Sequence, residues 1–244
     1  MLILIADSHL AENTSSHADF IKLLEWISSS PYDVCFLGDI MELWIALPKF
    51  EGSLHQKFLA WCGKESTQRK IYLLEGNHEF FVAARYAKHF TRCAGDSLQI
   101  GNDFFCHGDL IQRHQCDHLI FRRISKSRFA FFLLRFLPGI LKLVSLLQSF
   151  FQKKSRHYNK HLPLPEICHW LEQRKAKAGE NIFLGHFHQA YQEMRKDGTA
   201  LFCLPAWKEN QEIALFDPVT RCCTFLPWQQ VAELPIQPKK ESER

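Results

Sequence analysis

Two features that are common in other classes of protein are missing from this sequence of 244 residues. Its nine cysteines include no C-x-x-C pair, and their spacing does not match a disulfide framework. The N-terminus has no basic segment followed by a cleavable apolar stretch, as a secretory signal peptide would have. We therefore expect a protein of the reducing cytoplasm, with its cysteines in the thiol form.

The sequence also lacks an unbroken apolar run that could cross a membrane. Its most apolar region, residues 129–151, is interrupted by Arg135, by Pro138-Gly139 and by Lys142. No internal repeat is evident, and the net charge of +4 is too small to indicate a partner by itself. Lysine and arginine nevertheless far outnumber acidic residues between positions 113 and 160, which makes this segment a basic region.

Five short polar clusters are present, and each follows an apolar run that is typical of a buried β-strand. The runs are residues 2–5, 34–37, 71–74, 103–106 and 182–184, and the clusters are Asp7-Ser8-His9, Gly38-Asp39, Gly76-Asn77-His78-Glu79, His107-Gly108-Asp109 and Gly185-His186-Phe187-His188. Helical spacing at residues 20–27 and 54–61 alternates with the first strands and predicts a layered α/β sheet. Ligands bind such sheets at the carboxyl ends of the strands, so we expect the clusters to converge on one site.

The residue types in these clusters are those of a metal site. Asp7 and His9 are one residue apart, so an extended backbone would direct both side chains to one metal, and the same holds for His186 and His188. Asp39 has two oxygens with which to bridge two metals. Together with an amide oxygen and a further imidazole, this set suits Mn²⁺, Fe²⁺ or Zn²⁺. Two such ions about 3.5–4 Å apart can clamp both oxygens of a phosphoryl displacement.

In order, the clusters read D-x-H, G-D, G-N-H-E, H-G-D and G-H-x-H, and this set resembles the calcineurin-like metallophosphoesterase superfamily. The resemblance extends to about His188. It implies a layered α/β sandwich that holds two divalent metal ions. We expect both ions to be Mn²⁺. By resemblance, the first metal would take Asp7, His9, Asp39 and His188, and the second would take Asp39, Asn77, His107 and His186. His78 would stabilise charge or protonate the leaving oxygen, a task suited to a group that titrates near neutral pH.

The second motif continues as G-D-x-x-E-x-W, which is similar to the bacterial UDP-2,3-diacylglucosamine hydrolases of lipid A synthesis. That family also has an insertion of basic and apolar helices after H-G-D. The resemblance implies cleavage of a pyrophosphate to UMP and 2,3-diacylglucosamine 1-phosphate. We expect the protein to be cytoplasmic and peripherally associated with the inner membrane. At position 78 many of these hydrolases have Arg, whereas this chain has His, as in the wider superfamily.

These observations predict three parts of the chain. Residues 1–116 and 162–234 would form the core, residues 117–161 a helical cap over the site, and residues 235–244 a disordered tail. The cap would offer acyl chains an apolar groove and the diphosphate a set of cations. The candidates for substrate binding are Trp44, Asp117, Arg122, Lys153, Lys154 and Arg156. A buried helical hairpin is the alternative for the cap.

Two other functions are open to a chain with these motifs. A general phosphodiesterase or nuclease could use the basic segment as a nucleic-acid surface. Its aromatic residues stand in apolar runs and not singly, as base-stacking residues would, so we expect no nucleic-acid partner. A binding protein on an inactive fold would have lost metal ligands, whereas all seven candidates are present here. The sequence carries no indication of the oligomeric state.

Overall fold

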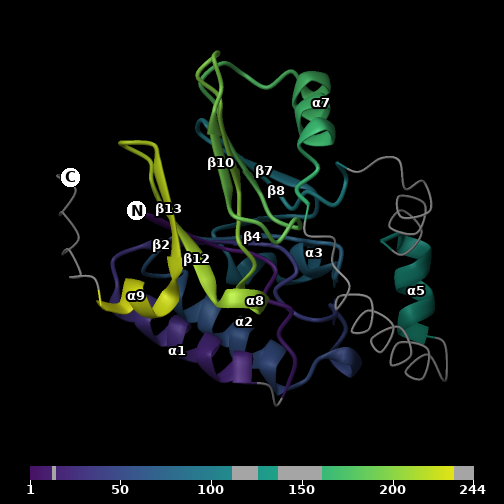
Figure 1. Cartoon of the computed structure of the whole chain (residues 1–244). Coiled ribbons are helices and arrows are strands. Elements are labelled where there is room, and N and C mark those ends of the chain that lie inside the picture. The colour runs from purple at the N-terminus through teal and green to yellow at the C-terminus, as the bar shows by residue number, and fades with distance from the viewer. Residues whose placement is uncertain (13–14, 112–125, 137–160, 234–244) are drawn as a thin grey trace.

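The computed structural model describes residues 1–12, 15–111, 126–136 and 161–233 (Figure 1). The strands predicted before the five polar clusters are confirmed. The α/β class is confirmed as well, but the strands divide between two sheets, which the sequence did not indicate. The proposed tail and most of the proposed cap lie outside the described residues.

A six-stranded sheet carries the first three motifs. Its strand order is β13-β12-β1-β2-β4-β6, in which β1, β2, β4 and β6 are parallel and β12 is antiparallel to both of its neighbours, β1 and β13. The strands are β1 (Leu2–Ile5), β2 (Asp33–Leu37), β4 (Ile71–Leu74), β6 (Arg92–Ala94), β12 (Glu212–Asp217) and β13 (Cys222–Pro227). Because β1, β2 and β4 are parallel neighbours, their carboxyl ends lie at one edge.

A five-stranded sheet carries the last two motifs. Its order is β10-β11-β9-β8-β7, with β11, β9 and β8 parallel and the two edge strands antiparallel. The strands are β7 (Ser97–Ile100), β8 (Asp103–Cys106), β9 (Asn181–Leu184), β10 (Tyr191–Met194) and β11 (Ala200–Cys203). The motifs after β8 and β9 therefore also share an edge.

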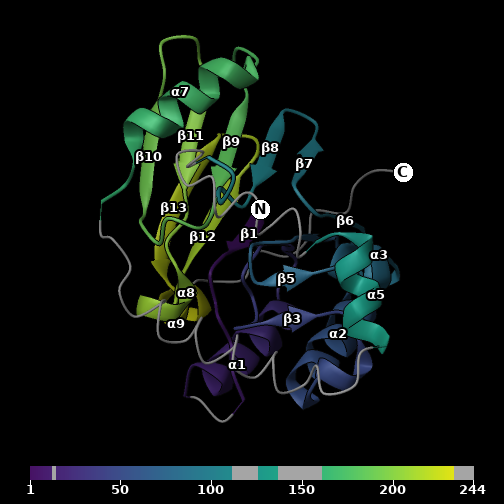
Figure 2. The same cartoon turned by 90° about the vertical axis from the view of Figure 1, so that its right-hand side faces the viewer.

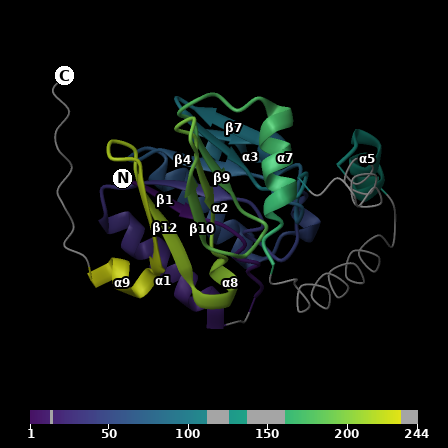
Figure 3. The ribbon, with the colours of Figure 1, turned by 45° about the horizontal axis from the view of Figure 1, so that its top comes forward.

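The two sheets pack face to face between helices, which gives four layers (Figure 3). Helices α1 (Ser15–Ser29) and α2 (Ser53–Glu65) cover the outer face of the six-stranded sheet, and α7 (Leu164–Arg174) covers that of the five-stranded sheet (Figure 2). The shorter elements are β3 (Trp44–Ile45), η1 (Pro48–Phe50), β5 (Glu79–Phe80), α3 (Val82–Tyr86), η2 (Ala87–His89), α5 (Arg128–Phe136), α8 (Trp207–Asn210) and α9 (Trp228–Glu233).

The four layers explain why the central strands are apolar throughout. In β1, Ile3 and Ile5 pack with the helices, while Leu4 packs with the other sheet. Successive side chains of a strand point to opposite faces, so a strand that is buried on both faces reads as a continuous apolar run. Among the described residues, no helix combines the length and apolar character that crossing a membrane requires.

The described part of the insertion contacts the core near the third motif. Phe131 and Leu134 of α5 pack against a small apolar cluster formed by Leu43, Ile45, Leu47 and Phe80. The Lys126 ammonium donates to the Glu75 carboxylate at 3.0 Å and to the carbonyl of Gly76 at 2.9 Å. Helix α5 is thereby tied to the loop that carries Asn77 and His78.

Candidate metal centre

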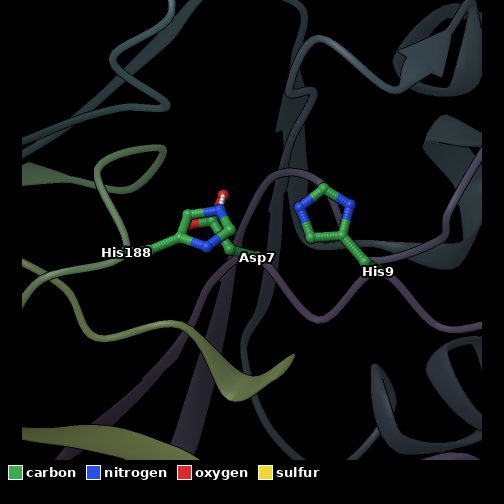
Figure 4. A group of neighbouring side chains, drawn as sticks. All are labelled: Asp7, His9 and His188. Atoms are coloured by element: carbon green, nitrogen blue, oxygen red, sulfur yellow. Dashed lines mark ion pairs between the residues drawn. The ribbon is translucent and has the colours of Figure 1, made fainter. Parts of the chain in front are cut away.

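The five motif loops meet where the two sheets come together at their carboxyl edges. Three groups of side chains have potential ligand atoms within 4.8 Å of one another: Asp7, His9 and His188; Asp39, His107 and His186; and His9, Glu42 and His78. Figure 4 shows the Asp7 carboxylate against the ring of His188, with the ring of His9 on the other side of the view. Asp7 and His9 follow β1, whereas His188 follows β9. The convergence that the sequence indicates is thus present in the fold.

The two aspartates are oriented in the same way. Asp39 accepts the backbone N–H of His78 through Oδ1 at 2.8 Å, and Asp7 accepts that of His186 through Oδ2 at 2.8 Å. The second oxygen of each carboxylate faces imidazoles. Asp39 Oδ2 lies 3.3 Å from His107 Nε2 and 3.8 Å from His9 Nε2. One oxygen of each aspartate therefore fixes the side chain, and the other points into the site.

Three imidazoles are anchored through Nδ1. His107 donates to the carbonyl of Leu37 at 2.8 Å, His78 to the carbonyl of Glu42 at 2.6 Å, and His188 to the carboxylate of Glu209 at 2.7 Å. These partners are acceptors, so Nδ1 carries the hydrogen and Nε2 faces the site. Metal-ligating histidines are commonly held in this way, because the outer bond fixes both the tautomer and the ring orientation.

The backbone at the motifs is not extended. Asp7 (φ 52°), His9 (φ 42°), Asp39 (φ 53°), His186 (φ 69°) and His188 (φ 53°) all have left-handed conformations. The expectation of an extended backbone is therefore wrong; Asp7 and His9 nevertheless lie in one group, as expected, but His186 and His188 do not. His186 joins Asp39 and His107, whereas His188 joins Asp7 and His9. Left-handed backbone at non-glycine residues is unfavourable by about 1–3 kcal/mol each and is concentrated at functional sites.

The pKa values follow from burial and the close packing of charges. Burial raises the pKa of Asp39, but His107 and His78 outweigh it and hold that pKa well below its usual value. Burial lowers the pKa of His107, but Asp39 outweighs it and raises the pKa to about 10. Burial and the neighbouring His107 lower the pKa of His186 to about 4. The charge of each of these side chains therefore depends on its close neighbours.

Two buried polar atoms fit a bound cation. Asp7 Oδ1 and His9 Nδ1 are buried and have no hydrogen-bond partner among the described residues, although His188 Nε2 is 3.3 Å from the former. Buried polar atoms without a partner are rare in folded proteins. A divalent ion would satisfy such atoms, and carboxylate and imidazole are ligand types that suit Mn²⁺, Fe²⁺ and Zn²⁺. Asn77 adds an amide oxygen 3.3 Å from His107 Nε2.

The second and third motifs approach each other more closely than side chains allow. A Cβ atom on Gly76 would lie 2.7 Å from the backbone nitrogen of Asp39 and closer still to its carboxylate. A Cβ atom on Gly38, which has φ 86°, would lie 2.6 Å from His107 Nδ1. Glycine is therefore required at both positions for the ligand loops to meet.

Helix α8 adds two residues to the site that the sequence did not indicate. The backbone nitrogens of Trp207 and Lys208 donate to the carbonyls of Ala6 and Asp7, which fixes α8 against the first motif. Glu209 orients His188, and the Lys208 ammonium lies 3.5 Å from a carboxylate oxygen of Glu42. Four residues without a recognisable motif give no local signal, so only the fold reveals them.

Trp44 does not lie at the surface of the site. Its side chain is fully buried between α2 and α3, where the indole nitrogen donates to Glu51 at 3.0 Å and the ring stacks on Tyr86. In this position the indole offers no surface to a substrate. The remaining candidates for substrate binding, Asp117, Arg122, Lys153, Lys154 and Arg156, lie outside the described residues.

Comparison with known proteins agrees with the motifs. A UDP-2,3-diacylglucosamine hydrolase of Pseudomonas putida is 27% identical over 151 residues, which cover 57% of this chain and 60% of the relative. The hydrolase of that name from Azotobacter vinelandii is 29% identical over 147 residues, which cover 56% and 59%. The chain thus spans about 60% of the length of these curated relatives.

Among solved structures, the phosphoesterase Yfce of E. coli aligns with a TM-score of 0.42 at 12% identity, over 93% of this chain and 98% of Yfce. The family model of the calcineurin-like phosphoesterases matches residues 1–190, which include all five motifs. This chain belongs to the calcineurin-like phosphoesterase family.

Proposed function

We propose that the protein is a dinuclear-metal hydrolase that cleaves the pyrophosphate of UDP-2,3-diacylglucosamine to UMP and 2,3-diacylglucosamine 1-phosphate, a step of lipid A synthesis. The reaction class is supported by the meeting of two aspartates and four histidines at one edge of both sheets. The substrate is supported by the names of the curated relatives and by the G-D-x-x-E-x-W motif.

In this proposal the first metal is held by Asp7, His9, Asp39 and His188, and the second by Asp39, Asn77, His107 and His186. This division is supported by the two groups in which Asp7 and Asp39 each gather histidines. Two bound divalent ions, for which we propose Mn²⁺, supply charge neutralisation to the phosphate oxygens and lower the pKa of water. Both aspartates are buried, which strengthens their attraction for a cation.

His78 is the proposed general acid. Its Nδ1 is fixed by the carbonyl of Glu42, and its Nε2 faces the site 3.9 Å from Asp39 Oδ2. A proton on Nε2 would therefore face the same side as Asp39, the proposed bridging ligand. Proton transfer from a positioned imidazole typically contributes about 10²–10⁴-fold to a rate.

We further propose that residues 1–116 and 162–234 form the catalytic core and residues 117–161 the cap. The described helix of the cap, α5, exposes Phe129, Phe132 and Phe136, which are 71%, 59% and 61% exposed. Such a face suits acyl chains or the surface of a membrane, and we propose peripheral contact with the inner membrane. Arg122, Lys153, Lys154 and Arg156 remain the proposed cations for the diphosphate, and Asp117 remains a proposed substrate-binding residue.

The alternative function is that of a general metal-dependent phosphodiesterase, nuclease or phosphatase of the same superfamily. It is favoured by His78, which stands where many UDP-2,3-diacylglucosamine hydrolases have Arg. The proposed function requires the cap to recognise the acyl chains of the substrate, whereas the alternative function does not. They therefore predict different orders of activity on lipid and non-lipid substrates.

The test is release of UMP from UDP-2,3-diacylglucosamine by chelator-treated protein, with Mn²⁺ either added or withheld. Parallel reactions use bis-p-nitrophenyl phosphate and a single-stranded oligonucleotide. We expect Mn²⁺-dependent UMP release, with kcat/KM for the lipid at least about 100-fold above that for the other two, which corresponds to about 2.7 kcal/mol of transition-state stabilisation. Equal values for all three substrates would favour the general phosphodiesterase.

A further inference from the structure

Glu79 is the last residue of the third motif, and no role has been given to it above. Its side chain is completely buried, and its carboxylate accepts four backbone N–H groups from the loops of the second and third motifs. We infer that Glu79 is a positioning residue that holds Asp39 and Asn77 where they can ligate a metal. This inference rests on the proposed metal centre.

Each oxygen of Glu79 has two donors. Oε2 accepts the N–H of Asp39 at 2.7 Å and that of Gly76 at 2.8 Å, so one atom joins the two loops. Oε1 accepts the N–H of Ile40 at 2.7 Å and that of Met41 at 3.4 Å. Consecutive backbone N–H groups that converge on one anion form a strong and geometrically specific site.

The connection between the loops is reciprocal. While Glu79 of the third motif binds the backbone of Asp39, the carboxylate of Asp39 binds the backbone of His78 in the third motif. Gly76 allows this approach because a side chain there would meet Asp39. Asn77 lies between Gly76 and His78, so both of its neighbours are fixed to the second motif. The two loops can therefore move only together.

A carboxylate is the only side chain of this length that can complete the arrangement. Four donors need four lone pairs, which the two oxygens of Glu79 provide. A glutamine has one acceptor oxygen, and its amide hydrogens would face two of the N–H groups. Asp39 is in the left-handed conformation, which persists only where its surroundings hold it, so loss of these bonds would release a ligand from its position.

The experiment is calorimetric titration of Mn²⁺ into chelator-treated full-length protein and its variants. The test variant is Glu79→Gln. The matched control is Glu65→Gln, because Glu65 is also buried and also accepts hydrogen bonds, from Arg69 at 2.9 Å and Ser28 at 3.0 Å, but lies on α2 away from the site. The Glu79→Gln variant is expected to bind Mn²⁺ about 10–100-fold more weakly than the wild type, as is typical for the loss of a group that orients ligands. The Glu65→Gln variant is expected to bind Mn²⁺ like the wild type.

A second variant, Glu79→Asp, keeps the charge but is one methylene shorter, so it cannot reach both loops. It is expected to show weakened Mn²⁺ binding even if Glu79→Gln fails to fold. Wild-type Mn²⁺ affinity in either folded Glu79 variant would overturn the inference, since Glu79 would then be structural only. Absence of Mn²⁺ binding by the wild type would instead contradict the proposed metal centre, so the two failures are distinguishable.

Discussion

Asp39 shows how a single residue serves both the fold and the site. One carboxylate oxygen accepts the backbone N–H of His78, and the other faces His9 and His107. Its backbone N–H is in turn bound by Glu79. An asparagine at this position could still accept the hydrogen bond from His78. It could not supply the negative charge that faces the imidazoles.

This division predicts the effect of Asp39→Asn. The amide oxygen can still accept the His78 N–H, so the fold is expected to remain, while the negative charge toward the metals is lost. We expect kcat/KM to fall by more than the roughly 10–100-fold that loss of an outer-shell group causes. The measurement is Mn²⁺-dependent hydrolysis, with circular dichroism to check the fold. The control is His169→Ala, on an exposed ring bonded to Gln173, and wild-type turnover by purified Asp39→Asn would contradict the dinuclear site.

At the scale of elements, α5 presents both a packed and an exposed phenylalanine among its described side chains. Phe131 contacts Phe81, with ring centroids 4.8 Å apart, whereas Phe132 is largely exposed. The helix is therefore expected to be docked by Phe131 and not by its neighbour.

The two phenylalanines form a matched pair for a test. Phe131→Ala removes a half-buried ring, for which we expect a loss of roughly 1 kcal/mol in the docking of α5. Hydrogen exchange of the amides in residues 126–136 should become about fivefold faster. Phe132→Ala should leave these rates unchanged, and equal acceleration by both substitutions would show that α5 is not docked in the way described.

A buried ion pair joins α7 to the start of β9. Arg174 donates to both oxygens of Glu180, at 2.6 and 2.9 Å, and the Glu180 side chain is only 1% exposed. The hydrogen bonds from Arg174 lower the pKa of Glu180 below its usual value of 4.5. Because the folded-state pKa is the lower one, the pair stabilises the protein above about pH 4.5, and this stabilisation is lost as the pH falls through the folded-state pKa.

Glu180→Gln is accordingly expected to lower the free energy of unfolding by about 1.5–3 kcal/mol at pH 7. The difference from the wild type should shrink in acid, where the wild-type carboxyl is protonated as well. Urea denaturation at a series of pH values measures it, with Glu172→Gln, on the exposed side of α7, as the control. A difference that does not change with pH would mean that charge is not the cause.

For the whole molecule, the metal centre lies where the two sheets join. Asp7, His9, Asp39 and Asn77 follow strands of the six-stranded sheet, while His107, His186 and His188 follow strands of the five-stranded sheet. Ions bound there would connect both halves of the fold, and they would bind the folded state and not the separated strands.

Metal binding is therefore expected to stabilise the entire domain. At a free Mn²⁺ concentration 100 times Kd the gain is about 2.7 kcal/mol, which corresponds to an increase in Tm of roughly 5–10 °C for a domain of this size. Calorimetry of chelator-treated protein before and after addition of Mn²⁺ measures the shift. Asp39→Asn should show little or none of it, and a full shift in that variant would place the bound Mn²⁺ elsewhere.

Much of this arrangement could be predicted from the sequence, because buried parallel strands produce apolar runs and the motifs follow them directly. The assignment of β1 and β8 to different sheets could not be predicted, because it depends on long-range pairing such as that of β1 with β12. The backbone of Asp7 could not be predicted either, because contacts with distant loops override the extended conformation that its neighbours favour. Trp44 is close to Asp39 in sequence, yet β3 turns it into the core.

Five proposed or candidate ligands have a left-handed backbone, which lowers the stability of the fold at the same positions that the activity requires: Asp7, His9, Asp39, His186 and His188. Glycine adopts that conformation without the steric cost that aspartate and histidine bear. A selection for heat resistance alone would therefore favour glycine at these positions, and each such substitution would remove a proposed ligand. Variants selected only for thermal stability are therefore expected to lose the proposed metal ligands, and with them the activity.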